Sequence, residues 1–292
     1  MEHDSPKLLF RLACEYLRSV ALVCPGVVPG VDEKPSEVGT GGGRRRPRQP
    51  PDAKAHSLKA VTCLDTGDDG LRYQDDPRSE VAAVVPPGRV LDVGCSRGAF
   101  GQQLKRLCPS RAVFGIEPTA AAEHAKARLD GVVKGWFPED LPKEWGKFDV
   151  LCFNDVLEHV VDPWGMLRAS APVLAPGGVV VASIPNVRYI NVLLDLVVHG
   201  DWKYEQVGVL DRTHLRFFTK RSLERLFTES GFVVNNITPI RLEESQRKGA
   251  RLVRALRLGP CFADILAQRY LVLAHMPPNI DYSCAQTVGG DA

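Results

Sequence analysis

The sequence predicts an α/β domain with a mostly parallel sheet and helices on both faces, over about residues 78 to 278 of the 292. From about residue 78, apolar runs of strand length alternate with amphipathic segments of helix length. The runs are almost continuously apolar, which is typical of strands covered on both faces in a parallel sheet. Ligands of such sheets bind at the carboxyl ends of the strands.

Seven segments are expected to be strands. In chain order they are residues 89–93, 112–117, 131–135, 148–154, 178–185, 232–240 and 269–276. Segments with a helical pattern separate the first five. The clearest begins at Asp162-Pro163, where an N-cap acid precedes a proline at the first helical position. It is expected to end at the Ala-Pro-Gly-Gly of residues 175–178.

The two ends of the chain differ from this domain. Residues 1–28 are predicted to form an amphipathic helix, because their apolar residues recur at helical spacing. Their apolar run is too short and too charged for a spanning helix or a signal peptide. Residues 29–57 are rich in proline and glycine, and residues 29–77 are predicted to be a disordered linker and lead-in. Residues 279–292 are expected to be a flexible tail.

Composition excludes several classes of protein. The chain is 44% hydrophobic and 25% charged with a net charge of +2, which favours neither nucleic acid nor a membrane surface as partner. Four arginines within residues 44–48 are interpreted as part of a solvated linker rather than as a nucleic-acid tag. The eight cysteines form no C-x-x-C pair, so neither a zinc site nor a disulfide framework is expected, and free thiols in a reducing cytoplasm fit best.

A glycine-containing loop, LDVGCSRGAF at residues 91–100, joins the first strand to a helix. Gly94 and Gly98 let a ligand approach the backbone, and the helix amides beyond offer donors to an anionic group. Glu117 ends the second strand, 19 residues after Gly98. An acid at that point can accept hydrogen bonds from both hydroxyls of a ribose, so a nucleoside-containing cofactor is expected.

Two cofactors compete for this loop. Forcing the dinucleotide pattern G-x-G-x-x-G onto it gives Ser96, Gly98 and Gly101, so the first glycine is missing. Asp92 would repel a pyrophosphate, whereas it would attract the amino group and sulfonium of S-adenosylmethionine. The loop alone therefore favours S-adenosylmethionine over NAD.

Five ordered blocks carry a resemblance to a known family. LDVGCSRGAFG, VFGIEP, FDVLCFNDVLEHVVDP, LAPGGVVVASIPNV and DRTHLRFFT resemble the class I S-adenosylmethionine-dependent methyltransferases. The similarity is greatest to a bacterial subgroup of ubiquinone-biosynthesis, polysaccharide-cluster and MetW-like proteins, and it spans about residues 78 to 276. It implies a Rossmann-like fold with a seven-stranded sheet whose last strand is antiparallel.

The resemblance also implies a set of cofactor-binding residues. Asp92, Gly94, Cys95 and Gly98 would border the methionine part, Glu117 would hold the ribose, Trp136 and Phe137 would contact the adenine, and Asn154 and Asp155 would flank the sulfonium. Trp136 stands where many members have an acid, so stacking would replace a hydrogen bond to the adenine amine, with Asp140 as a second candidate for that bond. The alternative for both aromatic residues is that they cap the core.

A polar cluster at residues 211–218, DRTHLRFF, supplies the catalytic candidate. Methyl transfer is an in-line displacement that needs alignment and, for a hydroxyl acceptor, a base. His214 is predicted to be that base, because histidine titrates near the working pH. Asp211 with Arg212 or Arg216 could equally form a buried ion pair, and His159 is interpreted as a structural residue at a helix start.

The sequence therefore predicts a cytoplasmic S-adenosylmethionine-dependent methyltransferase that acts on an oxygen of a small molecule or sugar. The alternatives are a MetW-like partner protein with the same fold and, less favoured, a nicotinamide-dependent oxidoreductase. Residues 186–202 are expected to cover the site as a lid or substrate wall. The basic helical face at residues 247–257 is interpreted as solvated, with a phosphorylated acceptor as the alternative. Nothing in these segments identifies the acceptor.

Overall fold

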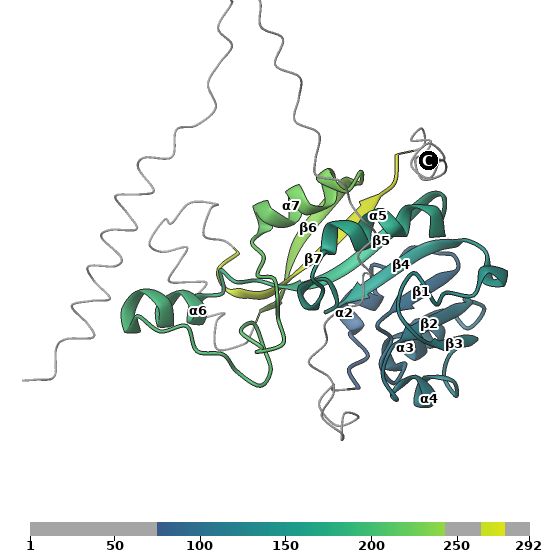
Figure 1. Ribbon diagram of the computed structural model, residues 1–292, viewed down its shortest axis with the longest axis horizontal. Helices are drawn as coiled ribbons and strands as arrows, with labels where there is room; N and C mark the ends of the chain where they lie inside the picture. The colour runs from purple at the N-terminus through teal and green to yellow at the C-terminus, as the bar shows by residue number, and fades with distance from the viewer. Residues whose placement is uncertain (1–74, 243–263, 278–292) are drawn as a thin grey trace, which may run out of the picture.

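Figure 1 shows the computed structural model, which describes residues 75–242 and 264–277. One seven-stranded sheet has the order β3-β2-β1-β4-β5-β7-β6. The first five strands pair in parallel, and β7 pairs antiparallel with both β5 and β6. The strands are β1 Val90–Val93, β2 Val113–Glu117, β3 Gly131–Lys134, β4 Phe148–Asn154, β5 Leu174–Pro185, β6 Val233–Leu242 and β7 Ala267–His275. All seven predicted strands, and the antiparallel last one, are confirmed.

Helices cover both faces of the sheet, as predicted (Figure 1). One face carries α2 Ser79–Ala82, α3 Ala99–Leu107 and α4 Ala122–Ala125, and the other carries α5 Pro163–Ser170 and α7 Lys220–Glu229. Short 3-10 turns lie at Lys143–Trp145, Leu157–His159 and Ala171–Val173. Each face has its own buried apolar cluster, so the sheet separates two cores.

Strand β4 shows why the predicted strands are apolar without alternation. Val150 and Cys152 point into the core beneath α2, α3 and α4, whereas Leu151 and Phe153 point into the core beneath α5 and α7. All four side chains are almost fully buried. Because neither face of the strand meets water, no polar residue is needed at every second position.

The helix predicted to begin at Asp162-Pro163 does so, since the Asp162 carboxylate accepts a hydrogen bond of 2.8 Å from the Gly165 amide. Its predicted end at residues 175–178 is wrong. The helix stops at Ser170 and passes through a 3-10 turn into β5. Pro172 explains the difference, because it lacks the amide that would bond to the carbonyl four residues before it.

Residues 186–202 form a separate excursion from the end of β5. Helix α6, Ile190–Leu194, continues into a π-helical turn at Asp195–His199, and both lie away from the sheet in Figure 1. Tyr189 and Val192 of this excursion pack with Val209 and Leu210 in a small third core. The helical spacing predicted for the segment is confirmed in part, while its role as a lid stays a prediction.

Several predictions fall outside the described residues. They concern the amphipathic helix of residues 1–28, the linker up to residue 74, the basic face at 247–257 and the tail at 279–292. Residues 75–77, the end of the predicted lead-in, are described, and Asp75 and Asp76 line the cavity described below. Across the described ranges, no helix combines the length and apolar character that crossing a bilayer requires.

Candidate active site

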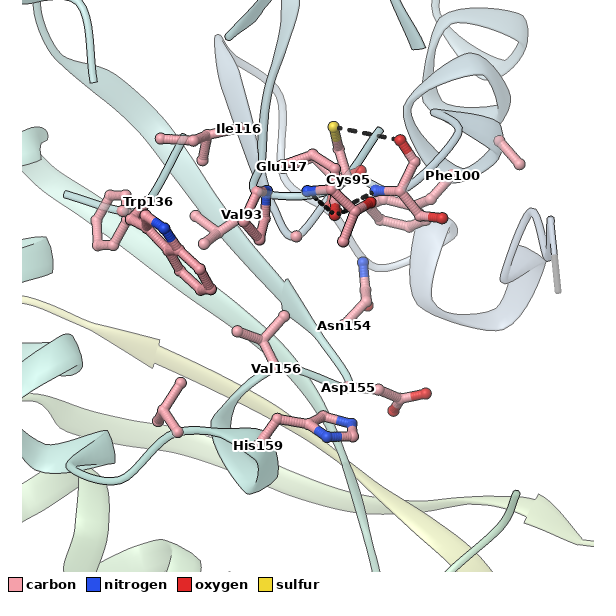
Figure 2. Close-up of a pocket in the computed structure, with 18 of the residues that line it drawn as sticks. Val93, Cys95, Phe100, Ile116, Glu117, Trp136, Asn154, Asp155, Val156 and His159 are labelled. Carbon is pink, nitrogen blue, oxygen red and sulfur yellow. Dashed lines mark hydrogen bonds between the residues drawn. The ribbon is translucent and has the colours of Figure 1, made fainter. Parts of the chain in front are cut away.

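A cavity lies at the carboxyl ends of β1, β2 and β4, the edge at which parallel sheets bind ligands (Figure 2). Eight of the nine predicted cofactor-binding residues line it: Asp92, Gly94, Cys95, Glu117, Trp136, Phe137, Asn154 and Asp155. The ninth, Gly98, does not. It precedes α3 with φ of 82°, and a Cβ placed there would lie 3.1 Å from the Ala125 Cβ. Gly98 therefore lets the loop pack against α4 rather than contacting a ligand.

The glycine loop keeps the floor of the cavity clear. Gly94 has φ of 71°, and a Cβ at this position would lie 2.8 Å from the Val156 Cγ2. A side chain there would be strained and would also clash. Ser96, at φ of 47°, adopts a left-handed conformation that is uncommon outside glycine, and its amide points at the next acid along the sheet edge.

That acid is Glu117, which is buried at the end of β2. Its carboxylate accepts a 2.9 Å hydrogen bond from the Ser96 amide, and bonds of 3.0 and 2.7 Å from the amide and hydroxyl of Thr119. These three bonds hold the side chain in the orientation drawn in Figure 2. A carboxylate has about four acceptor positions, so capacity remains for ribose hydroxyls.

Asp92 places a buried negative charge beside the loop. Its side chain is 2% exposed, and burial raises its pKa to about 7, although Arg78 opposes the shift. Burial makes the charged form of such a carboxyl unfavourable, and a neighbouring cation stabilises the charged form strongly. The residue therefore fits the positively charged end of S-adenosylmethionine.

The raised pKa of Asp92 predicts a pH-dependent affinity for the cofactor. The ionised carboxylate attracts a cation and the neutral acid does not, so affinity for S-adenosylmethionine should increase as the pH rises through about 7. Below that pH, binding should release a proton. Titration calorimetry in two buffers of different ionisation enthalpy measures this release. Asp92→Asn should abolish it, whereas Asp201→Asn, at an exposed position, should retain it. Equal proton release by both variants would contradict the assignment.

Arg78 and Asp155 line the cavity, and Arg269, which lies outside its lining, joins them in a bridge of three charged residues. The Asp155 carboxylate forms an ion pair with Arg78 at 2.6 Å and a second one with Arg269 on β7. The backbone of Asp155 has φ of 56°. All three side chains are largely buried. Sequence reasoning missed both arginines, because Arg78 precedes the first motif and Arg269 lies 114 residues after the aspartate. The group carries a net positive charge.

The aromatic residues occupy different surroundings. Trp136 lies across the cavity from Asn154 in Figure 2 and is partly exposed, so its ring is available to a planar ligand. Phe137 is 4% exposed and packs edge-to-face on Phe153 with ring centroids 5.9 Å apart, which agrees with the core alternative. Asp140 accepts a 2.8 Å hydrogen bond from the Trp136 amide and is absent from the cavity lining.

Asn154 shows that the cavity suits a polar ligand. The amide nitrogen and oxygen are both buried, and apart from an approach to Asp92, whose pKa it lowers, the amide has no hydrogen-bond partner among the described residues. Leaving such a group unpaired costs about 1–3 kcal/mol, so a bound molecule is expected to satisfy it. Together with the buried Asp92 and the oriented Glu117, this unpaired amide fits the amino-acid and ribose parts of S-adenosylmethionine.

A second group of polar side chains lies at one end of the cavity. Ligand atoms of Glu158, His159 and His214 all lie within 4.8 Å of one another, and the two imidazole centroids are 4.7 Å apart. His159 lines the cavity and His214 lies behind it, 8% exposed. Sequence reasoning treated the two histidines separately and missed Glu158. The adjacent Glu-His pair was the signal, but its partner comes from a segment more than 50 residues later.

The sequence alternative of a buried ion pair within residues 211–218 is not observed. Asp211 accepts hydrogen bonds of 2.8 and 2.7 Å from the amide and hydroxyl of Thr213. Arg216 donates to the Val161 carbonyl at 2.6 Å, and Arg212 is exposed. Asp211 therefore shapes the loop that presents His214.

Comparison with known proteins agrees with this geometry. A family model described as a methyltransferase domain matches residues 71–236. The chain is 34% identical over 107 residues to a ubiquinone biosynthesis O-methyltransferase of Xanthomonas campestris pv. campestris (strain B100), covering 35% of this chain and 45% of the relative. A protein of the same name from Aeromonas salmonicida (strain A449) is 28% identical over 162 residues, covering 52% and 66%. The matches thus span about half to two thirds of these relatives.

A solved structure gives a weaker likeness. A S-adenosylmethionine-dependent methyltransferase from Thermotoga maritima, described as a possible histamine N-methyltransferase, superposes with a TM-score of 0.48 and 20% identity, covering 69% of this chain and 88% of its own. Family membership depends instead on the sequence match, which extends over more than half of the chain. The chain belongs to the class I S-adenosylmethionine-dependent methyltransferases, and S-adenosylmethionine is its cofactor.

Proposed function

We propose that this methyltransferase transfers a methyl group to an oxygen of a small molecule or sugar. The observation that carries the proposal is the cluster of Glu158, His159 and His214 at the end of the cofactor cavity. A hydroxyl is a poor nucleophile until its proton is removed, and the cluster offers groups that can assist this removal. The relatives named as O-methyltransferases give independent support for oxygen as the acceptor atom.

The residues on the cavity wall suggest how the cofactor is held. Glu117 would bind the ribose hydroxyls, Trp136 would stack on the adenine, and Asp92 with Asn154 would meet the amino-acid end. The positive bridge of Arg78, Asp155 and Arg269 would attract the cofactor's carboxylate. When bound, S-adenosylmethionine supplies an electrophilic methyl group on a sulfonium.

A second cavity suggests where the acceptor binds. It lies between α6 and residues 203–210, and polar or charged side chains make up much of its wall: Asn191, Asp195, Lys203, Glu205, Gln268 and Arg269. Arg269 also pairs with Asp155 at the first cavity, so the two cavities share one wall. His214 is close to both, because its Nδ1 donates to the carbonyl of Val209, which lines the second cavity. A polar lining favours a hydroxylated acceptor.

The experiment that tests the function follows labelled methyl groups. The full chain is incubated with methyl-labelled S-adenosylmethionine and a panel of catechols, phenols and sugars, each matched by an amine of similar shape. We expect label on a hydroxyl oxygen of at least one member, located by mass spectrometry. Transfer to amines alone, by protein that binds S-adenosylhomocysteine, would refute oxygen as the acceptor.

A further inference from the structure

We propose that residues 75–78, named here the entry strap, are held against the cofactor cavity by two ion pairs and must open each time the cofactor enters or leaves. One anchor is the pair of Asp75 with Arg128. The other is the pair of Asp76 with Arg241. The proposal concerns cofactor exchange, so it goes beyond the proposed transfer to oxygen and does not depend on the acceptor.

The entry strap forms part of the cavity wall. Asp75, Asp76 and Arg78 line the cavity, and Arg78 donates a hydrogen bond of 2.6 Å to the Asp155 carboxylate. The strap comes from the chain just before α2, whereas the other lining residues belong to β1 and to the segments that follow it. Moving the strap therefore need not displace the glycine loop or Glu117.

The first anchor ties the strap to the glycine loop. Arg128, in the turn after α4, places its Nη1 2.8 and 2.6 Å from the two carboxylate oxygens of Asp75. The same nitrogen donates a hydrogen bond of 3.1 Å to the carbonyl oxygen of Arg97, which belongs to the glycine loop. One guanidinium thus joins the strap to the loop that borders the cavity.

The second anchor ties the strap to the far end of the chain's sheet. Arg241 lies near the end of β6, which is an edge strand, and it pairs with one carboxylate oxygen of Asp76. The other oxygen accepts a hydrogen bond of 2.9 Å from the Arg78 amide. The backbone of Arg78 is left-handed, with φ of 46°. Asp76 therefore both anchors the strap and fixes the turn that directs Arg78 toward the cavity.

The attachment of the entry strap is electrostatic rather than apolar. None of its residues belongs to the three buried apolar clusters, whereas Val81 and Ala82 of α2 do. The four anchoring side chains are between 24% and 35% exposed. Ion pairs that meet solvent contribute little to stability and are screened by salt. Opening therefore costs little, and the packed helix α2 provides a fixed hinge.

This construction suits a gate for cofactor exchange. Each turnover leaves S-adenosylhomocysteine in the cavity, and it must depart before another S-adenosylmethionine binds. Segments that open and close over a ligand often set the rate of such a release. Because the strap must open in both directions, a weakened anchor is expected to raise both the association and the dissociation rate constants.

Stopped-flow binding of S-adenosylhomocysteine to the full chain measures both constants, with tryptophan fluorescence as the signal because Trp136 lines the cavity. Asp75→Asn and Arg241→Gln should each raise both by about two- to fivefold at low ionic strength. The ligand has no net charge, so added salt should act on the strap and bring the wild-type constants toward those of the variants. Lys126→Gln, which removes an exposed ion pair with Glu123, should behave as the wild type does.

A double-mutant cycle tests whether the first anchor acts as a pair. Asp75→Asn and Arg128→Gln remove the same ion pair, so the double variant should exchange S-adenosylhomocysteine no faster than the faster single variant. Additive effects would mean that each residue acts separately, and they would overturn the anchor.

The remaining outcomes decide between a gate and a simple binding contact. Wild-type rate constants in Asp75→Asn and Arg241→Gln proteins would overturn the entry strap, once unchanged thermal midpoints show that both are folded. Faster dissociation with unchanged association would also overturn it, because that result describes a lost contact rather than a gate. No acceptor is present in these measurements, so they stand or fail independently of the proposed methyl transfer to oxygen.

Discussion

Replacing His214 by alanine should lower the rate of methyl transfer to a hydroxyl acceptor by about 10²–10⁴-fold, which is the usual contribution of one positioned proton-transfer group. Affinity for S-adenosylmethionine should change little, because the side chain of His214 is not part of the cofactor cavity lining. The turnover number, measured at saturating cofactor with the best acceptor of the panel, checks the first statement. Titration with S-adenosylhomocysteine checks the second.

The pH dependence distinguishes the ways in which His214 can act. Burial lowers its pKa below the usual value near 6.5, so as a free base it would make the wild-type rate rise with pH through that lowered value and level off above it. That rise would disappear in His214→Ala.

His124→Ala is the matched control, since His124 is exposed on α4 and distant in sequence from the cluster. A purely structural role would appear differently from a role as the base. His214→Ala would then melt at a lower temperature and lose cofactor affinity together with rate. Wild-type turnover at every pH in the variant would end the assignment of His214 as the base.

Replacing Glu117 by alanine should weaken S-adenosylmethionine binding by about 10²–10⁴-fold. The estimate takes two ribose hydrogen bonds to a charged group at about 1.5–3 kcal/mol each, with about 1.4 kcal/mol for each factor of ten. The loop should also lose order, because the amides of Ser96 and Thr119 lose their acceptor. Titration calorimetry with S-adenosylmethionine and S-adenosylhomocysteine measures the loss.

Glu117→Gln separates the effect of losing the carboxylate charge from the effect of losing the whole side chain. It keeps one oxygen acceptor and the side-chain length, but it places an amide donor toward groups that are themselves donors. We expect its affinity to lie between those of the wild type and Glu117→Ala. Glu123→Gln, at an exposed acid paired with Lys126, is the control and should bind normally. Normal affinity in a folded Glu117→Ala protein would contradict the ribose assignment.

Much of the fold could be predicted because each strand is buried on both faces. Residues 148–154, for example, are apolar almost throughout, and that pattern distinguishes them from the amphipathic helices without any tertiary information. The end of α5 was missed because a local stop signal, Pro172, precedes the more conspicuous glycines at 177 and 178. A proline beyond the first turn of a helix removes an internal hydrogen bond and ends the helix, whatever follows.

The sequence identified candidate residues in the glycine loop and at the ends of predicted strands, but not the pairs that distant segments form. Asp92, Gly94 and Cys95 belong to one loop, and the sequence of that loop alone predicts a ligand-binding site. The ion pair between Asp155 and Arg269, and the approach of His214 to Glu158, depend on how distant segments pack. A contact between two distant segments leaves no periodic pattern in the sequence. Sequence patterns therefore identify the individual side chains but not the contacts between them.

The position of β7 between β5 and β6 has a consequence for synthesis of the chain on the ribosome. Strand β6 leaves the ribosome before β7, yet in the described sheet it pairs only with β7. Its backbone therefore has no sheet partner until residues 267–275 have been translated. Strand β7 also carries Arg269, so the ion pair between Arg269 and Asp155, a residue of the cofactor cavity, forms equally late. A nascent chain holds the glycine loop and Glu117 early, but it reaches binding competence only when β7 inserts between its neighbours.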